Sequence, residues 1–401
     1  MASQFRGVTA LETHGAILDL IRSQGVVSRT ELVTRSGLTG ASITRIVRQL
    51  LQDGLVVETG QAESTGGKPR TLLQLNAAAR VAVGISVDQP SMTYLLTDLN
   101  GDVIGRRTAK GSGTKPPYAV MSRIAEETRS LLSTSGIDHT DLLGVGLAVA
   151  GRQDSPYRTL HSDPRATEWE NFDLQHPLSA ALDTTVAVDN DSACAAVGEF
   201  WVGRMSSSEN VATIYMTDGI GLGLMIKGAL YRGASGNAGQ VSHITVDPMG
   251  PECECGRRGC LHAVASPRRI VELARADPGL SAELRLPASG RSGRRDFEKI
   301  AAAAARHHPE ARRLVGDSAD HLASVLVSLT NVLDLHRIIL AGPGFTRVGD
   351  LYAAAAREQL ERFSYLRDVH PTEVSVSTKG PDSAALGAAS LVLQSRLTPG
   401  R

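Results

Sequence analysis

Three of the four cysteines of this chain, Cys253, Cys255 and Cys260, lie within eight residues, and His243 precedes the first of them by ten positions. Three thiolates and an imidazole at this spacing can bind one tetrahedral metal ion, and Cys₃His is a common structural zinc set. Glycines in the same stretch allow the backbone to fold tightly around the ion. The sequence therefore predicts a structural zinc site with these four ligands.

Two other interpretations of the cysteines are possible, namely surface thiols and a disulfide. The chain shows no secretory leader, so we expect its thiols in a reducing compartment, where disulfides rarely persist. No apolar stretch of the sequence approaches the roughly 18 residues that span a bilayer. We therefore expect a cytoplasmic protein with no membrane partner. The fourth cysteine, Cys194, falls in a predicted buried helix and is expected to be core packing.

Residues 236–243, Gly-Asn-Ala-Gly-Gln-Val-Ser-His, precede a Cys-x-Cys-Gly-x-x-Gly-Cys run. Together the two stretches resemble the zinc signature of the ROK family, which contains sugar kinases and sugar-responsive repressors. The resemblance implies an actin-like ATPase (ribonuclease H-like) α/β body of two lobes with a ligand cleft between them. It also implies that the zinc loop borders the sugar site, where His243 both binds the metal and contacts the sugar.

The resemblance also identifies candidate sugar contacts. Residues 188–192, Val-Asp-Asn-Asp-Ser, match the family segment whose Asp is the general base toward the sugar hydroxyl. Asn190 and Asp191 are therefore candidate ligand contacts, and Asp191 is a vestigial base that can still accept a hydrogen bond. The alternative is that an Asp of this segment caps the helix that follows. Gln240 and His262 stand where the family has glutamates that accept hydrogen bonds from sugar hydroxyls.

A third family contact, an Asn, corresponds to Arg165 in this chain. The exchange of carboxylates for Arg and His side chains makes the predicted pocket more positive. An anionic effector, such as a phosphorylated or acidic sugar, is one hypothesis. The same substitutions also fit a pocket that no longer binds any ligand.

The phosphate side of the predicted cleft departs from the kinases of the family. Where they carry Asp-x-Gly-Gly-Thr, residues 88–92 of this chain are Asp-Gln-Pro-Ser-Met, and the proline removes an N–H donor. Where they carry Gly-Thr-Gly, residues 219–221 are Gly-Ile-Gly, preceded by Asp218, whose charge repels phosphate. Phosphate-binding turns need glycine and free N–H groups. We predict that phosphoryl transfer is lost, with no ATP bound and no catalytic residues.

The elements that position these residues follow from hydrophobic patterning. From about residue 80, apolar strands such as residues 81–87 and 211–216 alternate with helices such as residues 316–335, which predicts two α/β lobes. The predicted first lobe comprises residues 77–190 and 382–401, because the last helix returns to it. The second lobe comprises residues 191–381 and contains the zinc loop.

The first 76 residues have a different pattern. It predicts a helix over residues 14–23, a second helix opened by a capping box at Ser28 and Glu31, a third from residue 39 or 40 to 54, and two strands. This order is typical of a winged helix-turn-helix, whose third helix enters the major groove of DNA. The polar face of that helix could be an ordinary solvated surface, or it could contact bases through Ser42, Thr44, Arg45 and Arg48.

The predicted wing ends in Gly-Gly-Lys-Pro-Arg at residues 66–70. Lys68 and Arg70 could follow the phosphate backbone or enter a narrow minor groove, or the stretch could be a flexible linker. Lys plus Arg and Asp plus Glu both number 42. No overall basic field therefore favours nucleic acid, and any DNA-binding surface must be local.

These features predict a transcriptional regulator, most consistent with a repressor, whose body senses a carbohydrate or sugar derivative. Its expected partners are a palindromic double-stranded DNA operator, a small sugar effector and a second copy of itself, as a homodimer or homotetramer. Two alternatives remain at the level of sequence. One is an ATP-dependent sugar kinase with an added DNA-binding domain, and the other is an effector-independent regulator whose body only dimerises.

Overall fold

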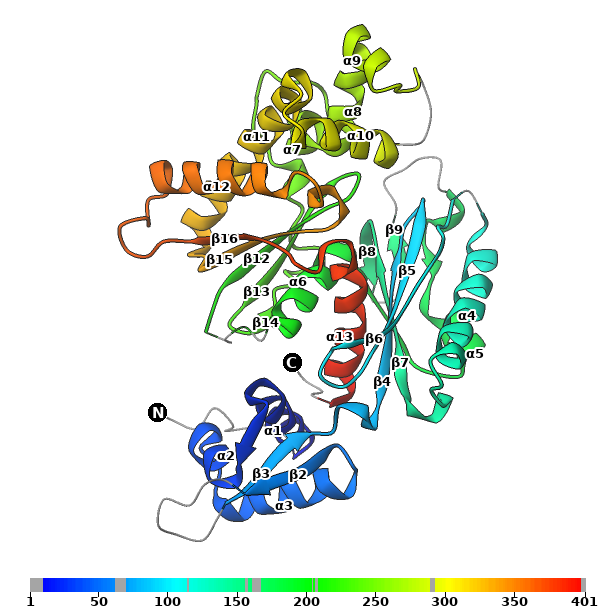
Figure 1. Cartoon of the computed structure of the whole chain (residues 1–401), viewed down its shortest axis with the longest axis vertical. Coiled ribbons are helices and arrows are strands. Elements are labelled where there is room, and N and C mark those ends of the chain that lie inside the picture. Colours follow the sequence, from blue (N-terminus) through cyan, green and yellow to red (C-terminus); the bar gives the residue numbers. More distant parts are fainter. Residues whose placement is uncertain are drawn as a thin grey trace.

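A computed structural model describes residues 10–61, 70–113, 115–155, 158–160, 167–203, 205, 208–288 and 293–397. It confirms the predicted architecture, with a winged helix-turn-helix followed by two α/β lobes (Figure 1). No helix in the described part of the chain is long and apolar enough to cross a bilayer.

The winged helix consists of three helices and a three-stranded antiparallel sheet with the order β1-β3-β2. Ser28 and Glu31 form the predicted capping box, and Gly37 ends the second helix in the left-handed conformation. The first strand, which is three residues long and ends at the capping serine, was not predicted. The elements are α1 (Ala10–Gln24), β1 (Val26–Ser28), α2 (Arg29–Ser36), α3 (Gly40–Gln52), β2 (Val56–Gln61) and β3 (Thr71–Leu75).

The first lobe is built on a five-stranded sheet with the order β11-β7-β4-β5-β6. β4, β5 and β6 are antiparallel, and β4, β7 and β11 are parallel. The elements are β4 (Val81–Val87), β5 (Ser91–Thr97), β6 (Val103–Lys110), α4 (Pro117–Thr134), β7 (Leu142–Val149), α5 (Gln175–Leu182) and β11 (Val186–Asn190). A small sheet is added by β8 (Arg152–Ser155), β9 (Arg158–Leu160) and β10 (Phe172–Asp173).

The second lobe repeats this topology, with the strand order β14-β13-β12-β15-β16. Its strands are β12 (Val211–Met216), β13 (Ile220–Ile226), β14 (Ala229–Leu230), β15 (Arg337–Ala341) and β16 (Glu373–Val376). Its helices are α6 (Asp191–Val202), α7 (Leu261–Ala265), α8 (Pro267–Ala276), α9 (Pro278–Glu283), α10 (Gly293–Ala305), α11 (Pro309–Leu333) and α12 (Gly349–Phe363).

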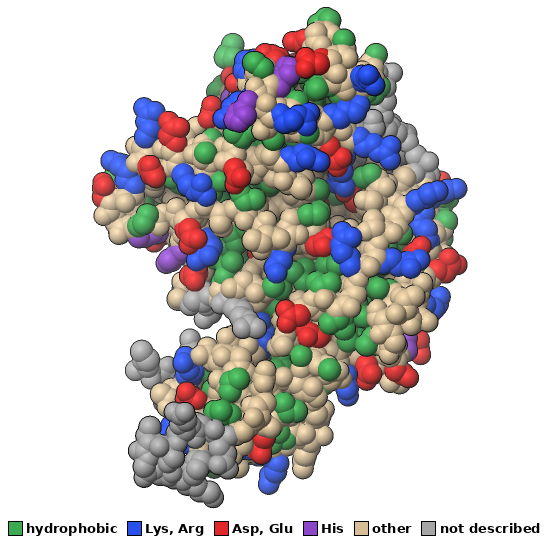
Figure 2. All heavy atoms as spheres, viewed as in Figure 1, with side chains coloured by type: hydrophobic (Ala, Val, Ile, Leu, Met, Phe, Trp, Pro, Cys, Tyr) green, Lys and Arg blue, Asp and Glu red, His purple; other side chains and the backbone are tan. Residues whose placement is uncertain are grey.

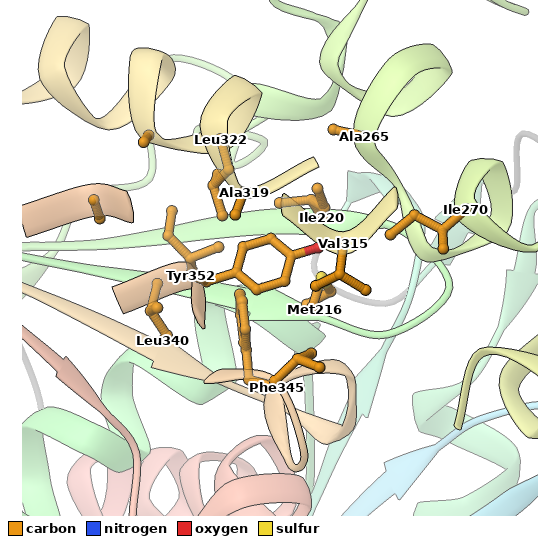
Figure 3. Close-up of a cluster of buried hydrophobic side chains, with 14 of the residues drawn as sticks. Met216, Ile220, Ala265, Ile270, Val315, Ala319, Leu322, Leu340, Phe345 and Tyr352 are labelled. Atoms are coloured by element: carbon orange, nitrogen blue, oxygen red, sulfur yellow. The ribbon is translucent and has the colours of Figure 1, made fainter. Parts of the chain in front are cut away.

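The core of the second lobe surrounds Tyr352, which is 1% exposed (Figure 3). Its ring meets Phe345 edge-on at a centroid distance of 5.2 Å. Its buried hydroxyl has a partner in the Ser318 hydroxyl at 2.7 Å, and Ser318 is also 2.6 Å from the Ala265 carbonyl oxygen. These bonds join α7, α11 and α12, so the helices that follow the cysteine loop are fixed to the rest of the lobe.

The last helix, α13 (Ser383–Leu397), packs on β4 and β7 of the first lobe and also on α6. The helix α13 can approach these two strands closely because the strands carry glycines where they face it. A Cβ on Gly84 would lie 1.8 Å from the Ala385 carbonyl oxygen, and one on Gly146 would lie 2.0 Å from that of Ala388. The two lobes therefore meet at a pair of crossing helices, α6 and α13.

Candidate effector cleft, metal cluster and DNA-reading helix

The four predicted metal ligands converge, with their ligand atoms all within 4.8 Å of one another. The Cys255 and Cys260 sulfurs are 3.6 Å apart, and the Cys253 sulfur is 3.5 Å from Nδ1 of His243. A tetrahedral zinc ion with Zn–S bonds of about 2.3 Å places ligand atoms roughly 3.7 Å apart. The described cysteines are all free thiols, and Cys194 is fully buried away from the cluster. The cluster thus has the composition and the size for one metal ion.

Local backbone geometry explains why the ligand loop contains glycine. Gly256 and Gly259 both have positive φ angles. A Cβ on Gly259 would lie 1.4 Å from the Asp247 carbonyl oxygen, so only glycine fits there. Isolated bridges between Thr245 and Cys260 and between Glu252 and Arg258 close the loop. Because η4 (Val241–His243) precedes it, the loop places His243 beside the cysteines.

Asp191 is the first residue of α6, close enough to Asp88 of the first lobe for their charges to interact, and is partly exposed. Burial by the surrounding protein raises its pKa to about 6, and the negative charge of Asp88 acts in the same direction, against the N–H donation from Ser192. Asp191 is thus a carboxylate that changes protonation near neutral pH. Above this pH the ionised carboxylate can accept a charge-assisted hydrogen bond from a ligand hydroxyl.

The helix cap that the sequence alternative assigned to an Asp of this segment belongs to Asn190 instead. Asn190 is the N-cap of α6, and its side-chain oxygen accepts from the Ser192 and Ala193 N–H groups at 3.0 and 3.4 Å. Its amide nitrogen donates to the Gly151 carbonyl oxygen at 3.1 Å. Ligand contact by Asn190 stays a prediction, and it would require one of these bonds to be exchanged.

The other two predicted sugar contacts lie near the metal cluster. The rings of His243 and His262 have centroids 6.4 Å apart, and His262 also faces Gly219 on the second phosphate-like loop. Gln240 is exposed and lines a small pocket together with Asn190 and Arg232. The structure thus brings His243 and His262 together and places Gln240 beside Asn190. Arg165 lies outside the described residues.

Arginines near the cleft are paired with carboxylates. Arg232 bonds Asp189 at 2.7 Å, and Arg294 bonds Asp88. A third, Arg268, lies 3.5 Å from Glu272 on the same helix. Among the described residues, Asp191 and Asp218 make no ion pair. These three arginines therefore offer no unpaired positive charge to an anionic effector. The predicted positive pocket itself stays a prediction, because Arg165 lies outside the described residues.

The first phosphate-like loop offers few backbone donors. The Gln89 N–H donates to the carboxylate of the adjacent Asp88 at 2.7 Å, and Pro90 has no N–H. The carbonyl oxygens of residues 88–90 accept from the N–H groups of residues 111–113. The other carboxylate oxygen of Asp88 accepts from Arg294. A phosphate at this turn would meet a carboxylate and a proline instead of amide groups.

The second phosphate-like loop carries the carboxylate of Asp218, whose pKa is raised by burial and by the charge of Asp88, with Arg294 opposing. The contact made by Arg294 was not predicted from the sequence. In the structure α10 begins at Gly293, and its second residue reaches the opposite lobe. No local pattern indicates this contact, because its partner is 206 residues away.

A second contact joins the lobes on the sugar side, and it was also missed. The Asn237 side-chain oxygen accepts from the Gln153 N–H at 2.8 Å, and its amide donates to the Gln153 carbonyl oxygen at 2.7 Å. Asn237 belongs to the stretch that precedes the metal cluster. The amide of Asn237 therefore fixes the edge of the second lobe to β8 of the first.

The helix α3, which is predicted to read DNA, lies on the side of the winged helix away from the body (Figure 1). Its apolar residues Ile43, Ile46 and Val47 are buried, while Arg45 and Arg48 are exposed and make no ion pair among the described residues. Basic and acidic side chains are interspersed over the face drawn in Figure 2. The helix is thus free to contact another molecule through two arginines.

The other side chains predicted to contact DNA differ in their exposure and in whether they already have a hydrogen-bond partner. The Ser42 hydroxyl lies 3.0 Å from that of Thr39, the N-cap of α3, and the Thr44 hydroxyl donates to the Gly40 carbonyl oxygen at 2.8 Å. Arg70 is exposed at the base of the wing, and Lys68 lies outside the described residues. The two arginines of α3 therefore carry the strongest case for base contact.

Comparison with known proteins gives two family matches, ROK over residues 82–395 and winged helix-turn-helix DNA-binding over residues 11–57. The xylose repressor of Caldicellulosiruptor bescii is 24% identical over 382 residues, which are 95% of each chain. A ROK family transcriptional regulator described as a homologue of the E. coli MLC protein superposes with a TM-score of 0.73 at 24% identity, over 97% of both chains. A ROK family glucokinase from Streptomyces griseus, crystallised with glucose and AMPPNP, gives 0.63 at 25% identity, over 78% of this chain and 98% of its own.

Proposed function

We propose that this chain, which belongs to the ROK family, is a DNA-binding transcriptional repressor whose body binds a neutral monosaccharide and transfers no phosphate. The observation that carries the proposal is the exposed polar face of α3 on a winged helix joined to this body. The full-length similarity to a xylose repressor supports it. Two-fold pairing of the chain would give a palindromic operator, with a homodimer as the smallest assembly that reads it.

The DNA-binding part is tested by selecting binding sites from a pool of random duplexes. If Arg45 contacts a base edge, Arg45→Ala should weaken binding to the selected site by about 1–3 kcal/mol, or roughly 5- to 150-fold. Binding to random duplex should change much less, because only phosphate contacts remain there. Arg29→Ala is a matched control, since Arg29 is already paired with Glu58 at 2.9 Å. Equal losses on both duplexes would make Arg45 a phosphate contact.

A neutral effector follows from the charges of the cleft. The described arginines near it are paired, and the two carboxylates without an ion pair, Asp191 and Asp218, would repel a phosphate or a uronate. A carboxylate near a sugar hydroxyl instead accepts a charge-assisted hydrogen bond. D-xylose, D-glucose and N-acetyl-D-glucosamine should be compared with their phosphates and uronates by thermal unfolding. Stabilisation by the anionic forms alone would contradict this assignment.

We further propose that the metal is zinc and that it is structural. Four protein ligands leave no open position for a reactive water. When bound, zinc would fix His243 and the loop that carries Gln240, and so shape the sugar side of the cleft. Metal content by mass spectrometry, with one zinc per chain expected, tests this assignment.

Retention of Asp191 favours one alternative, a sugar kinase with an added DNA-binding domain, because a carboxylate with a pKa near 6 is suited to general base catalysis. The first phosphate-like loop argues against it, since Pro90 has no N–H and the Gln89 N–H binds Asp88. The carboxylate of Asp218 on the second loop would repel a phosphate. Sugar-dependent release of ADP, lost in Asp191→Asn, would establish the kinase.

A further inference from the structure

The helix α1 of the winged helix packs against the body, and not only against its own domain (Figure 1). Ile17, Leu18 and Ile21 share one buried cluster with Trp201 at the end of α6. The same cluster contains Ala389, Val392 and Leu393, near the end of α13. A single helix of the DNA-binding domain therefore contacts the C-terminal parts of both crossing helices.

Each crossing helix is seated on the sheet of a different lobe. On the second-lobe side, a Cβ on Gly223 would lie 2.3 Å from the Ser192 carbonyl oxygen of α6. On the first-lobe side, Gly84 and Gly146 make the same kind of contact with α13. The two helices touch where a Cβ on Gly387 would lie 1.6 Å from the Cys194 carbonyl oxygen. Any rotation of one lobe against the other must therefore change the angle between α6 and α13.

A specific polar contact ties α1 to the end of α6. The guanidinium of Arg22 stacks over the Trp201 ring at 3.7 Å from its centroid and donates to the Trp201 carbonyl oxygen at 3.2 Å. Asp19 holds the same guanidinium at 3.0 Å. Arg22 is 8% exposed and Trp201 5% exposed. A buried cation at the negative end of a helix is favourable, and the stacking adds to it.

The opposite end of α6 is the candidate effector site. Asn190 caps the helix, Asp191 is its first residue, and the 12-residue helix spans about 18 Å. The ring N–H of Trp201 has no acceptor among the described residues. The position of the ring therefore depends on packing and on Arg22. A packed α-helix transmits a displacement of one end to the other as a rigid element.

We propose that the Arg22–Trp201 contact couples sugar binding to DNA binding. A sugar at Asp191 sets the position of α6, and the contact makes α1, and with it the winged helix, follow that position. This inference rests on the proposed function of sugar-dependent DNA binding. Effector binding shifts the angle between α6 and α13, and α1, which is packed on both, moves the DNA-reading helix with it. The coupling is the ratio of operator Kd values with and without the sugar.

Two conservative variants of the full-length protein test the contact. Arg22→Gln removes the charge, and Trp201→Phe keeps an aromatic ring but loses part of the stacking surface. Both should bind D-xylose, or whichever of the three neutral sugars stabilises the wild type, with nearly unchanged affinity. Their coupling ratio should fall to within about twofold of one, against a typical range of 5- to 150-fold. Arg362→Gln is the matched control, since Arg362 stacks on the exposed Phe363 at 5.0 Å, far from the junction.

Fluorescence gives a direct reading of the junction. The chain has two tryptophans, so Trp169→Phe leaves Trp201 alone. Its emission should change when that variant is saturated with the sugar. A wild-type ratio of one would overturn the proposed function and this inference with it. A wild-type coupling that both Arg22→Gln and Trp201→Phe preserve, or a Trp201 emission that the sugar leaves unchanged, would overturn the inference alone.

Discussion

The polar groups on the sugar side of the cleft and those on the phosphate side have different bonding partners. On the sugar side, the Asp191 carboxylate accepts from the Ser192 N–H at 2.8 Å but has no ion pair among the described residues, Gln240 is exposed, and His243 belongs to the metal cluster. On the phosphate side, Asp88 binds its neighbour's N–H and an arginine of the opposite lobe. Recognition of a sugar and binding of phosphate therefore depend on separate groups. One can be retained when the other is lost.

Removal of the metal should have the largest effect, because it releases the loop that borders the sugar side. We expect Cys253→Ser to lose the zinc. If that costs about 3 kcal/mol, the thermal midpoint should fall by roughly 6–12 °C for a lobe of this size. Cys194→Ala should keep one zinc per chain, since Cys194 lies in the core. Equal metal content in both variants would show that the cluster is not the zinc site.

Loss of the carboxylate at position 191 should weaken sugar binding next most strongly. A hydrogen bond to a charged group contributes about 1.5–3 kcal/mol, so Asp191→Asn should raise the sugar Kd by roughly 10- to 150-fold in calorimetry. Asp183→Asn is a suitable control, because Asp183 is exposed at the end of α5, outside the described cleft. An unchanged Kd in Asp191→Asn would remove Asp191 from the site.

The pH dependence of sugar binding should follow Asp191. Because its pKa is raised to about 6, the carboxylate is ionised above this pH and protonated below it. Only the ionised form accepts a charge-assisted hydrogen bond, so affinity should level off above pH 7 and fall by roughly tenfold at pH 5. Asp191→Asn should flatten this profile. Tighter binding at low pH would contradict the assignment.

Changes on the phosphate side should affect sugar binding least. Arg294→Gln removes the cation beside Asp88 and should leave the sugar Kd at pH 7 within about threefold of the wild type. The pKa of Asp218, which Arg294 lowers, should rise. Arg294→Lys keeps the charge and serves as the control. A large loss of sugar affinity in Arg294→Gln alone would show that the two sides of the cleft are not independent.

The parts of the fold that were predicted are those with a strong local pattern. The strands 81–87 and 211–216 and the capping box at Ser28 all match the structure. β6 was missed because it is an edge strand with no buried face, and its residues alternate between exposed and half-buried. α11 begins seven residues before the predicted start, where Pro309 follows the N-cap His308.

The site was predictable where a motif lies within a short stretch, as for the metal cluster. It was not predictable where partners are distant in sequence. The contacts Arg294–Asp88, Asn237–Gln153 and Arg22–Trp201 join residues 84 to 206 positions apart. The sequence also does not show that the described arginines near the cleft, Arg232, Arg268 and Arg294, have carboxylate partners. The hypothesis of a positive pocket also involves Arg165, which lies outside the described residues.

The central claim, that the body senses a sugar without phosphorylating it, is tested most directly by calorimetry of the zinc-loaded protein. The neutral sugar that stabilises the protein would be titrated with and without Mg-ATP, and ADP would be assayed in the same samples. Our account predicts the same Kd in both titrations and no sugar-dependent ADP. A sugar affinity that depends on Mg-ATP, together with ADP release that Asp191→Asn abolishes, would contradict it and identify a kinase.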